Sequence, residues 1–243
     1  MIKLAIAGFC GKMGQRIFAL AAEDKNFKVV IGLEKTGHPE IGKIVNGVRI
    51  TDNLEEIKGC DCILDFTIAA ATLANLPYIV KNKKCAVIGT TGLDESQQAK
   101  VKETAKKTAI VFSPNMSVGV NLLFNLVKTA SRTLDGYKVS IEEAHHIHKK
   151  DAPSGTAKRF AEIINEHGFG IKTSDIKAIR EDEIVGDHKI VFESEVDTIE
   201  LSHHAKTRDI FVKGALIAAK WVVGKKAGLY SMDDVLSEKI NKK

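Results

Sequence analysis

The sequence predicts an α/β protein with a doubly wound parallel sheet on its N-terminal side, followed by a smaller α+β domain. Three observations predict this fold class. Short apolar segments alternate with helical ones through the first half, which is typical of a parallel sheet covered on both faces. The first apolar segment runs directly into a glycine-rich turn. After Pro114 the alternation ends, and long helices and polar-rich strands follow.

The expected strands of the first half are short and apolar, at residues 2–7, 28–33, 62–66, 85–88 and 109–112. Between them, apolar residues recur at helical spacing in residues 12–23, 68–83 and 94–107. Pro77 lies within the second of these helices, and we expect it to kink or divide that helix because proline lacks a backbone donor.

The second half predicts a different arrangement. Helical spacing is found in residues 117–134, 156–167, 209–223 and 232–239. Strand-like segments are expected at residues 137–144, 188–193 and 195–201. The last two are polar-rich and close in the chain, which indicates an antiparallel pair.

Composition and charge exclude several classes of protein. The net charge is +5, but lysines are interleaved with acids, as in residues 95–107, and no aromatic stacking motif for nucleic acid is present. No apolar run approaches the roughly 18 residues of a membrane span. Residues 2–7 are too short for the apolar core of a secretory signal. We therefore expect a cytoplasmic protein with no nucleic-acid or membrane partner.

The cysteines do not indicate a disulfide framework or a zinc site. They are Cys10, Cys60, Cys62 and Cys85. Their spacing matches neither a set of disulfides nor a paired C-x-x-C zinc motif. We expect reduced and mostly buried thiols.

A glycine turn follows the first expected strand, with Gly8, Gly11 and Gly14 three residues apart. Missing side chains let the backbone approach a pyrophosphate, and a helix N-terminus offers it unpaired N–H groups. Glu34 ends the second strand about 20 residues later, where a carboxylate accepts hydrogen bonds from ribose hydroxyls. The alternative is a tight strand-to-helix turn with a surface acid. The context favours a Rossmann-type dinucleotide domain, although Cys10 replaces the usual second glycine.

Lys35 follows Glu34 directly and bears on the choice of cofactor. An acid alone repels a 2′-phosphate and favours NADH, whereas an adjacent cation neutralises that phosphate and admits NADPH. The pair predicts that the protein accepts NADPH or NADH.

Two further turns lie at the same expected edge of the sheet. Residues 89–92, Gly-Thr-Thr-Gly, follow the fourth strand and suit close approach to a nicotinamide ribose. The alternative is an ordinary loop with a hydroxyl turn. Residues 113–116, Ser-Pro-Asn-Met, follow the fifth strand. There Asn115 either binds the nicotinamide amide or caps the next helix.

Residues 142–156 (E-E-A-H-H-I-H-K-K-D-A-P-S-G-T) concentrate groups that move protons and groups that bind anions. His145, His146 and His148 converge poorly on one metal ion, because adjacent side chains of an extended backbone point to opposite faces. Lys149 and Lys150 also repel a cation. We therefore expect no metal, and we interpret the segment as proton chemistry beside an anion pocket.

Within this segment a histidine can serve as general acid or base near neutral pH. Lys149 either donates a proton or acts as a fixed positive charge. Ser154, Gly155 and Thr156 open a helix whose free N–H groups and hydroxyls can bind a carboxylate or phosphate. The alternative for Ser154 is a helix cap alone.

These motifs together resemble the 4-hydroxy-tetrahydrodipicolinate reductase family, also called dihydrodipicolinate reductase, of the diaminopimelate route to lysine. The resemblance covers nearly the whole chain. The segments that carry it are residues 143–157, 7–14, 65–67, 89–92 and 115–121.

The resemblance implies an NAD(P)H-dependent reduction of a small cyclic imine with two carboxylates. It implies that His145 is a proton donor and acceptor, and that Lys149 is a proton donor. The substrate carboxylates would be held by His146, Ser154, Gly155 and Thr156. The cofactor would be held by Gly8, Phe9, Cys10, Gly11, Lys12, Met13, Glu34, Lys35, Gly89, Thr90, Thr91, Ser113, Pro114, Asn115 and Met116.

The resemblance also implies the domain organisation and the assembly. Residues 1–114 and 217–243 would form the NAD(P)-binding domain, because the family's last helices return to it. Residues 115–216 would bind substrate and join a homotetramer through their sheet. Phe9 and Cys10 replace smaller residues common in the family's turn, so the pyrophosphate contacts are expected to differ there.

Two other functions remain open on the residues alone. One is another nicotinamide-dependent oxidoreductase with a separate substrate domain, which has no evident use for residues 145–156. The other is a non-catalytic NAD(P)-sensing protein, which would need a partner-binding module that the sequence does not display.

Overall fold

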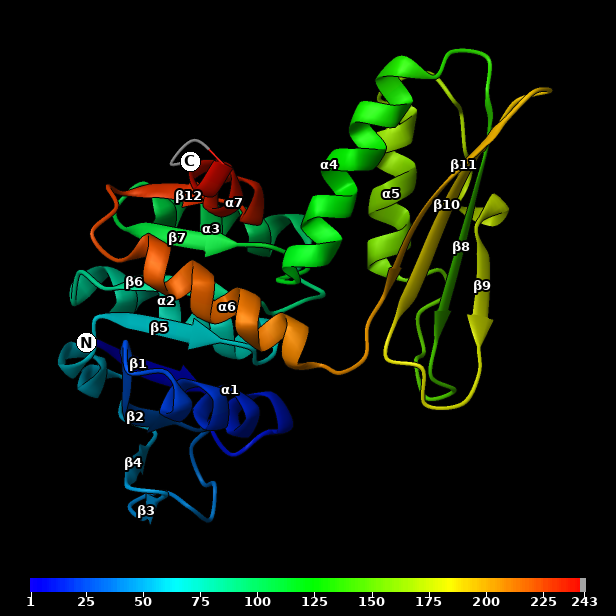
Figure 1. Ribbon diagram of the computed structural model, residues 1–243. Helices are drawn as coiled ribbons and strands as arrows, with labels where there is room; N and C mark the ends of the chain where they lie inside the picture. The colour runs from blue at the N-terminus through cyan, green and yellow to red at the C-terminus, as the bar shows by residue number, and fades with distance from the viewer. Residues whose placement is uncertain (241–243) are drawn as a thin grey trace. The chain divides into compact units, whose positions relative to one another are not determined.

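The chain folds into two compact units (Figure 1). The computed structural model describes residues 1–240, and the side chains of residues 1–237. Unit 1 contains residues 1–116 and the described part of 211–243, and unit 2 contains residues 117–210. The end of the expected segment 217–243, residues 241–243, lies outside the described residues.

Unit 1 is built on an eight-stranded sheet in the order β12-β7-β6-β5-β1-β2-β4-β3. Only β3 is antiparallel to its neighbour, so the expected parallel sheet is confirmed. Its strands are β1 (Ile2–Ala7), β2 (Phe27–Leu33), β3 (Ile44–Val45), β4 (Val48–Thr51), β5 (Cys62–Asp65), β6 (Cys85–Ile88), β7 (Ala109–Phe112) and β12 (Gly228–Tyr230). Successive strands are added on opposite sides of β1, so the topological switch point lies between β1 and β5.

Helices cover both faces of this sheet, α2 and α3 on one face and α1 and α6 on the other (Figure 1). The helical elements of the unit are α1 (Lys12–Glu23), the 3-10 helix η1 (Leu54–Gly59), α2 (Ala69–Lys81), α3 (Glu95–Ala105), α6 (Asp209–Val222) and α7 (Met232–Ile240). Pro77 lies inside α2 without dividing it, because the helix runs on to Lys81. Of the expected kink or division, the division is therefore wrong, and the kink stays a prediction.

Unit 2 has a four-stranded sheet in the order β11-β10-β8-β9, with two helices on one face (Figure 1). Its elements are α4 (Val118–Thr133), β8 (Lys138–His145), α5 (Gly155–Asn165), the 3-10 helix η2 (Thr173–Asp175), β9 (Lys177–Arg180), β10 (Asp187–Glu193) and β11 (Thr198–His204). β10 and β11 are antiparallel, as predicted, but β11 begins three residues later than the expected strand 195–201.

Alternation along β8 and β10 decides which side chains face the helices. Ile141, Glu143 and His145 are buried on β8, and His188, Ile190 and Phe192 on β10. Because side chains alternate between the faces of a strand, two histidines and a glutamate share this face with the apolar core. Apolar side chains of α4 and α5, among them Phe124 and Phe160, complete the core.

All four cysteines of the chain are free thiols, as expected. Across residues 1–240, no helix combines the length and the apolar character that crossing a membrane requires.

Candidate functional site

The glycine turn between β1 and α1 is shaped by close backbone approach. Gly8 has φ +69°, a conformation that side chains disfavour, and the Gly11 N–H donates to the Gly8 carbonyl at 3.0 Å. A Cβ on Gly14 would lie 2.2 Å from the Gly8 carbonyl oxygen. Only glycine therefore lets α1 begin this close to the strand. Among the side chains that the structure describes, none caps the start of α1, which leaves its first N–H groups for a ligand.

Glu34 lies against this turn, as the sequence predicts. Its Oε1 accepts a hydrogen bond from the Cys10 N–H at 2.8 Å. Both residues line a pocket of 620 Å³ together with Gly8, Gly11 and Lys35. The turn, the acid and the adjacent lysine are thus gathered at one cavity. The pocket also includes His38 and Asp52, which sequence reasoning missed because they lie in irregular connections.

Phe9 faces away from the pocket. Its side chain is fully buried and packs edge-to-face on Phe18, with ring centroids 5.5 Å apart. A Cβ on Gly32 would lie 2.7 Å from the Phe9 ring, so the missing side chain of Gly32 makes room for this bulky residue. Phe9 can therefore serve a ligand only through its backbone. Lys12 is exposed, and Met13 is partly exposed, in the first turn of α1.

Asp65 organises the ends of β5 and β6. It is fully buried and accepts hydrogen bonds from the Thr67 N–H at 3.1 Å, from Asn75 at 2.9 Å and from Thr90 at 3.2 Å. Thr72 also donates to the Thr90 hydroxyl at 2.8 Å. The Thr90 side chain is thus engaged inside the unit, whereas Thr91 is exposed.

Gly89, Ser113, Asn115 and Met116 are also closely packed. A Cβ on Gly89 would lie 2.2 Å from the Phe66 ring, so glycine is required beside that ring. The Ser113 hydroxyl donates to the carbonyl of Asn115 at 2.9 Å, and Met116 is buried while Pro114 is exposed. Ser117, rather than Asn115, caps α4, since its hydroxyl accepts from the Val120 N–H at 3.2 Å.

In unit 2, β8 ends in a buried acid–histidine pair. Glu143 is 1% exposed and His145 is 9% exposed, and both point to the helix-covered face of the sheet. The Nδ1 atom of His145 is in hydrogen-bond contact with Oε2 of Glu143. This contact leaves Nε2 as the ring nitrogen available for proton exchange. Gly186 lies against it, since a Cβ there would be 3.0 Å from Nε2.

Glu143 is held as an anion by three partners. Its Oε1 accepts from the Ser154 N–H at 3.1 Å and from Arg180 Nη2 at 2.7 Å, while Oε2 contacts His145. Burial alone would raise the pKa of Glu143, but the hydrogen bonds from these partners outweigh it and lower the pKa to about 2. The carboxylate therefore ties β8, β9 and the start of α5 to the histidine.

His188 lies behind His145 without a hydrogen-bond partner among the described side chains. Its ring meets that of His145 edge-on, with centroids 5.3 Å apart, and it also lies 5.9 Å from the Phe160 ring. Both of its nitrogens are buried and unpaired. Burial and the neighbouring His145 lower the pKa of His188 to about 3. His188 is therefore neutral at physiological pH and acts as a packing surface for His145.

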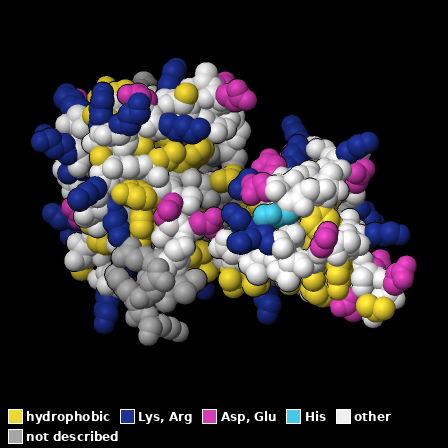
Figure 2. Space-filling model, turned by 90° about the horizontal axis from the view of Figure 1, so that it is seen from above, with side chains coloured by type: hydrophobic (Ala, Val, Ile, Leu, Met, Phe, Trp, Pro, Cys, Tyr) yellow, Lys and Arg dark blue, Asp and Glu magenta, His cyan; other side chains and the backbone are white. Residues whose placement is uncertain are grey.

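Basic side chains surround the loop between β8 and α5. Arg208 Nη2 lies 3.3 Å from Nε2 of His146, and burial together with this guanidinium lowers the pKa of His146. Lys149 Nζ is paired with Asp151 Oδ1 at 2.8 Å. This loop lies at the lower end of unit 2 in Figure 1, and Figure 2, which is seen from above, shows the other end, where basic and acidic side chains are interspersed.

The loop ends at the N-terminus of α5, whose cap is Ser154. The Ser154 hydroxyl accepts from the Ala157 N–H at 3.2 Å, so the helix-cap alternative describes this side chain. Gly155 is exposed, and Thr156 follows it in the first turn of α5. The helix N-terminus thus lies next to the Glu143–His145 pair, because the Ser154 N–H is bound to the same carboxylate.

The three histidines of residues 145–148 have three different partners. His145 contacts Glu143, His146 contacts Arg208, and His148 is exposed with Glu183 3.9 Å away. Lys150 is exposed as well. Each ring thus has its own polar partner, and the His146 and His148 rings also lie with centroids 6.2 Å apart.

Comparison with known proteins identifies the family. Residues 2–116 match the model of the N-terminal part of dihydrodipicolinate reductase, and residues 119–236 match that of the C-terminal part. The chain belongs to the dihydrodipicolinate reductase family. The resemblance predicted from the motifs is thereby confirmed.

Relatives extend this family match along the whole chain. A 4-hydroxy-tetrahydrodipicolinate reductase of Geotalea daltonii is 40% identical, and the match covers 98% of this chain and 100% of the relative. One from Geobacter sulfurreducens is also 40% identical, with the same coverage of both chains. Family membership therefore applies to both units.

Solved structures confirm the predicted fold class. Dipicolinate-bound dihydrodipicolinate reductase from Paenisporosarcina sp. TG-14 superposes with a TM-score of 0.81 at 25% identity, over 96% of this chain and 99% of that one. An amine dehydrogenase from Mycobacterium smegmatis shares the fold at a TM-score of 0.64 and 10% identity, over 96% and 95% of the two chains.

Sequence reasoning missed four residues that shape the unit 2 site: Glu143, Arg180, His188 and Arg208. Glu143 had a local signal, because it lies two residues before His145 on a strand and so shares its face. The two arginines had none, since their contacts join residues 37 and 62 positions apart in the chain.

Proposed function

We propose that the chain is an NAD(P)H-dependent oxidoreductase that reduces 4-hydroxy-tetrahydrodipicolinate to tetrahydrodipicolinate in the diaminopimelate route to lysine. The observation that carries this proposal is the buried Glu143–His145 pair beside the start of α5, found in a member of this family. The pair would supply a proton donor, and the start of α5 would bind the carboxylates of the substrate. Reduction of an anionic cyclic imine needs both.

NADPH or NADH fits the unit 1 pocket. The turn around Gly8 lines the pocket with backbone, because Gly8 and Gly11 carry no side chain, and Glu34 stands at its edge for the ribose hydroxyls. Lys35 adjoins Glu34, where it would face a 2′-phosphate. When bound, the cofactor supplies a hydride. Backbone groups would make most of the contacts with the cofactor, those of residues 9–13, 89–91 and 113–116.

The substrate would be anchored by its two carboxylates in unit 2. Backbone N–H groups of Gly155 and Thr156 open α5 and favour an anion through the helix dipole. His146 and Arg208 add donors on the same loop cluster. Ser154 would contribute by shaping the helix start rather than through its capping hydroxyl.

Proton transfer would fall to His145 and Lys149. After water is lost from the substrate and a hydride is added, the ring must gain a proton. Nδ1 of His145 faces the Glu143 carboxylate, which orients the ring and leaves Nε2 to exchange the proton. Lys149, paired with Asp151, would supply a second proton donor, its ammonium group.

The test is oxidation of NADPH or NADH followed in the presence of freshly generated substrate. We expect turnover with both cofactors, and a fall in kcat of about 10² to 10⁴-fold for His145→Gln, as for a lost general acid. The matched control is His148→Gln, because His148 is exposed. Unchanged turnover in His145→Gln would reject its role. Binding of NADPH without turnover would favour a cofactor-sensing protein.

We propose further that the enzyme is a cytoplasmic homotetramer joined through unit 2, with unit 1 for the cofactor and unit 2 for the substrate. The side chains of Lys189, Val191 and Glu200 lie on the sheet face opposite α4 and α5 by strand alternation. Sedimentation of the purified chain and of a Val191→Lys variant tests the assembly. A wild-type chain that sediments as a monomer would reject it.

A further inference from the structure

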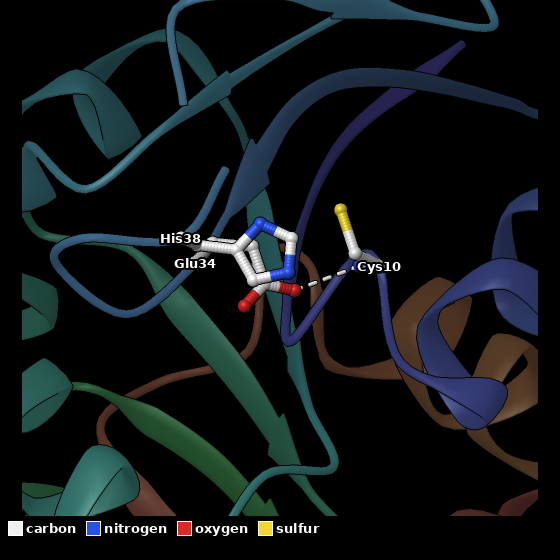
Figure 3. Close-up of side chains that lie close together, drawn as sticks. All are labelled: Cys10, Glu34 and His38. Carbon is white, nitrogen blue, oxygen red and sulfur yellow. Dashed lines mark hydrogen bonds between the residues drawn. The ribbon is translucent and has the colours of Figure 1, made fainter. Parts of the chain in front are cut away.

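Cys10, Glu34 and His38 form a cluster at the wall of the unit 1 pocket (Figure 3). One ligand atom from each lies within 4.8 Å of the other two. Figure 3 shows the three side chains close together, from the glycine turn, the end of β2 and the connection that follows it. All three line the 620 Å³ pocket. The cluster is therefore reachable by a ligand that enters the pocket.

Thiolate, carboxylate and imidazole are the three ligand types that zinc binds in proteins. Zinc–ligand bonds of about 2.0–2.3 Å in a tetrahedron place ligand atoms about 3.3–3.7 Å apart. Since the present separations reach at most 4.8 Å, the atoms would need to approach by about 1.5 Å or less. Three protein ligands would leave the fourth position for water.

The cluster has one fixed side and one adaptable side. The hydrogen bond from the Cys10 N–H to Glu34 Oε1, at 2.8 Å, fixes the turn to the strand end, and the carboxylate has a second oxygen for an ion. His38 belongs to an irregular connection. Its Nδ1 accepts from the Glu40 N–H at 3.2 Å, a long hydrogen bond that metal binding would replace at small cost.

The charges of the ligands suit a divalent cation. An ion that binds the Cys10 sulfur displaces the thiol proton and leaves a thiolate close to the Glu34 carboxylate. The bound thiolate and carboxylate would then neutralise a divalent cation between them. A soft ion that holds thiolate strongly suits this set better than Mg²⁺ or Ca²⁺, which prefer oxygen ligands alone.

We propose that Cys10, Glu34 and His38 bind Zn²⁺, and that the ion and the dinucleotide exclude each other. The exclusion rests on the proposed function, because Glu34 is the group assigned to the ribose hydroxyls. Once the Glu34 carboxylate holds a metal, it no longer accepts from the ribose. Zinc would thus act as a reversible inhibitor that competes with the cofactor and not with the imine.

The first experiment uses Co²⁺ as a spectroscopic probe on the purified, cofactor-free chain. We expect a thiolate-to-cobalt charge-transfer band that Zn²⁺ abolishes. Cys10→Ser should lose the band, and His38→Gln should weaken cobalt affinity about tenfold or more, as for one lost ligand. Cys85→Ser is the matched control, because its thiol donates to the Asp61 carbonyl and a hydroxyl can replace it. Absence of the band, or its survival in Cys10→Ser, would overturn the site.

The second experiment measures the Kd of NADPH by its fluorescence at increasing free Zn²⁺. Competition predicts that the apparent Kd rises about tenfold when zinc stands at ten times its own Kd. The cobalt band of the first experiment should also fade as NADPH is added. A cobalt band together with an NADPH Kd that zinc does not change would overturn the mutual exclusion of metal and cofactor. If NADPH does not bind at all, the proposed function fails, whereas the cobalt result still decides the metal site.

Discussion

Replacing Glu143 with glutamine should cost stability and activity together. Glu143 is the buried anion that joins His145, Arg180 and the Ser154 N–H. Glutamine keeps the shape but removes the charge, so the partly buried Arg180 guanidinium loses its counter-ion. Its amide also presents a donor where the carboxylate presented only acceptors.

The size of the stability effect follows from the pKa of Glu143. Folding lowers it from 4.5 to about 2. At about 1.4 kcal/mol per pKa unit, ionised Glu143 contributes about 3 kcal/mol at neutral pH. Because the folded pKa is the lower one, this contribution is complete above about pH 4.5 and is lost as pH falls toward 2. Loss of a partner that orients a reactive histidine should lower kcat by about 10 to 100-fold.

Urea unfolding followed by circular dichroism measures the stability change, and steady-state kinetics measures kcat. We expect Glu143→Gln to cost about 3 kcal/mol at pH ~7, and about half of that at pH ~3. The matched control is Glu142→Gln, the neighbouring residue on the opposite face, whose exposed pair with Lys177 should contribute less than about 1 kcal/mol. Equal costs for the two variants at neutral pH would refute the reasoning. A cost for Glu143→Gln that does not change with pH would refute it as well.

Three further predictions concern unit 2. His188→Leu should reduce the loss of stability in acid. In the wild type, His188 is protonated below about pH 6.5 in the unfolded state but stays neutral in the folded state. The free energy of unfolding therefore falls by about 2 kcal/mol between pH ~6.5 and ~4.5. Equal acid sensitivity of variant and wild type in urea unfolding would contradict this. Ser154→Ala should lower the free energy of unfolding by about 1 kcal/mol through the lost cap, while Ser154→Gly should cost less; a larger loss in the glycine variant would argue against a capping role. Arg208→Gln should raise the substrate KM about tenfold, as for one lost charged hydrogen bond, and leave the NADPH KM unchanged. A rise confined to the NADPH KM would reject Arg208 as a substrate ligand.

The parts of this protein that were predictable from sequence are those set by local geometry. The glycine turn could be predicted because Gly8 and Gly14 are required by backbone contacts within one strand–turn–helix unit. Glu34 could be predicted as the acid beside the glycine turn because it directly follows β2. This strand pairs in parallel with β1, so the two strands end side by side. Residues 142–156, the candidate catalytic segment, were visible because one strand, one loop and one helix start carry most of the candidate site of unit 2.

The parts that were not predictable depend on distant contacts or on weak local signals. The strands β3, β9 and β12 are only two to four residues long and lack the continuous apolar run of four residues that marks β6 and β7. No local sequence pattern indicates that the Thr90 hydroxyl donates to Asp65, which lies 25 residues earlier. Pro77 did not divide α2, because packing of the helix on the sheet overrides its local tendency.

The division of unit 1 between the two ends of the chain constrains the order of folding during synthesis. Unit 2 is complete once residue 210 has been made, whereas unit 1 still lacks α6, β12 and α7 at that point. Until β12 arrives, the edge of β7 is unpaired, and an unpaired edge strand is a template for association with other chains. A ribosome-released fragment ending near residue 225 should therefore aggregate through unit 1 while unit 2 resists proteolysis.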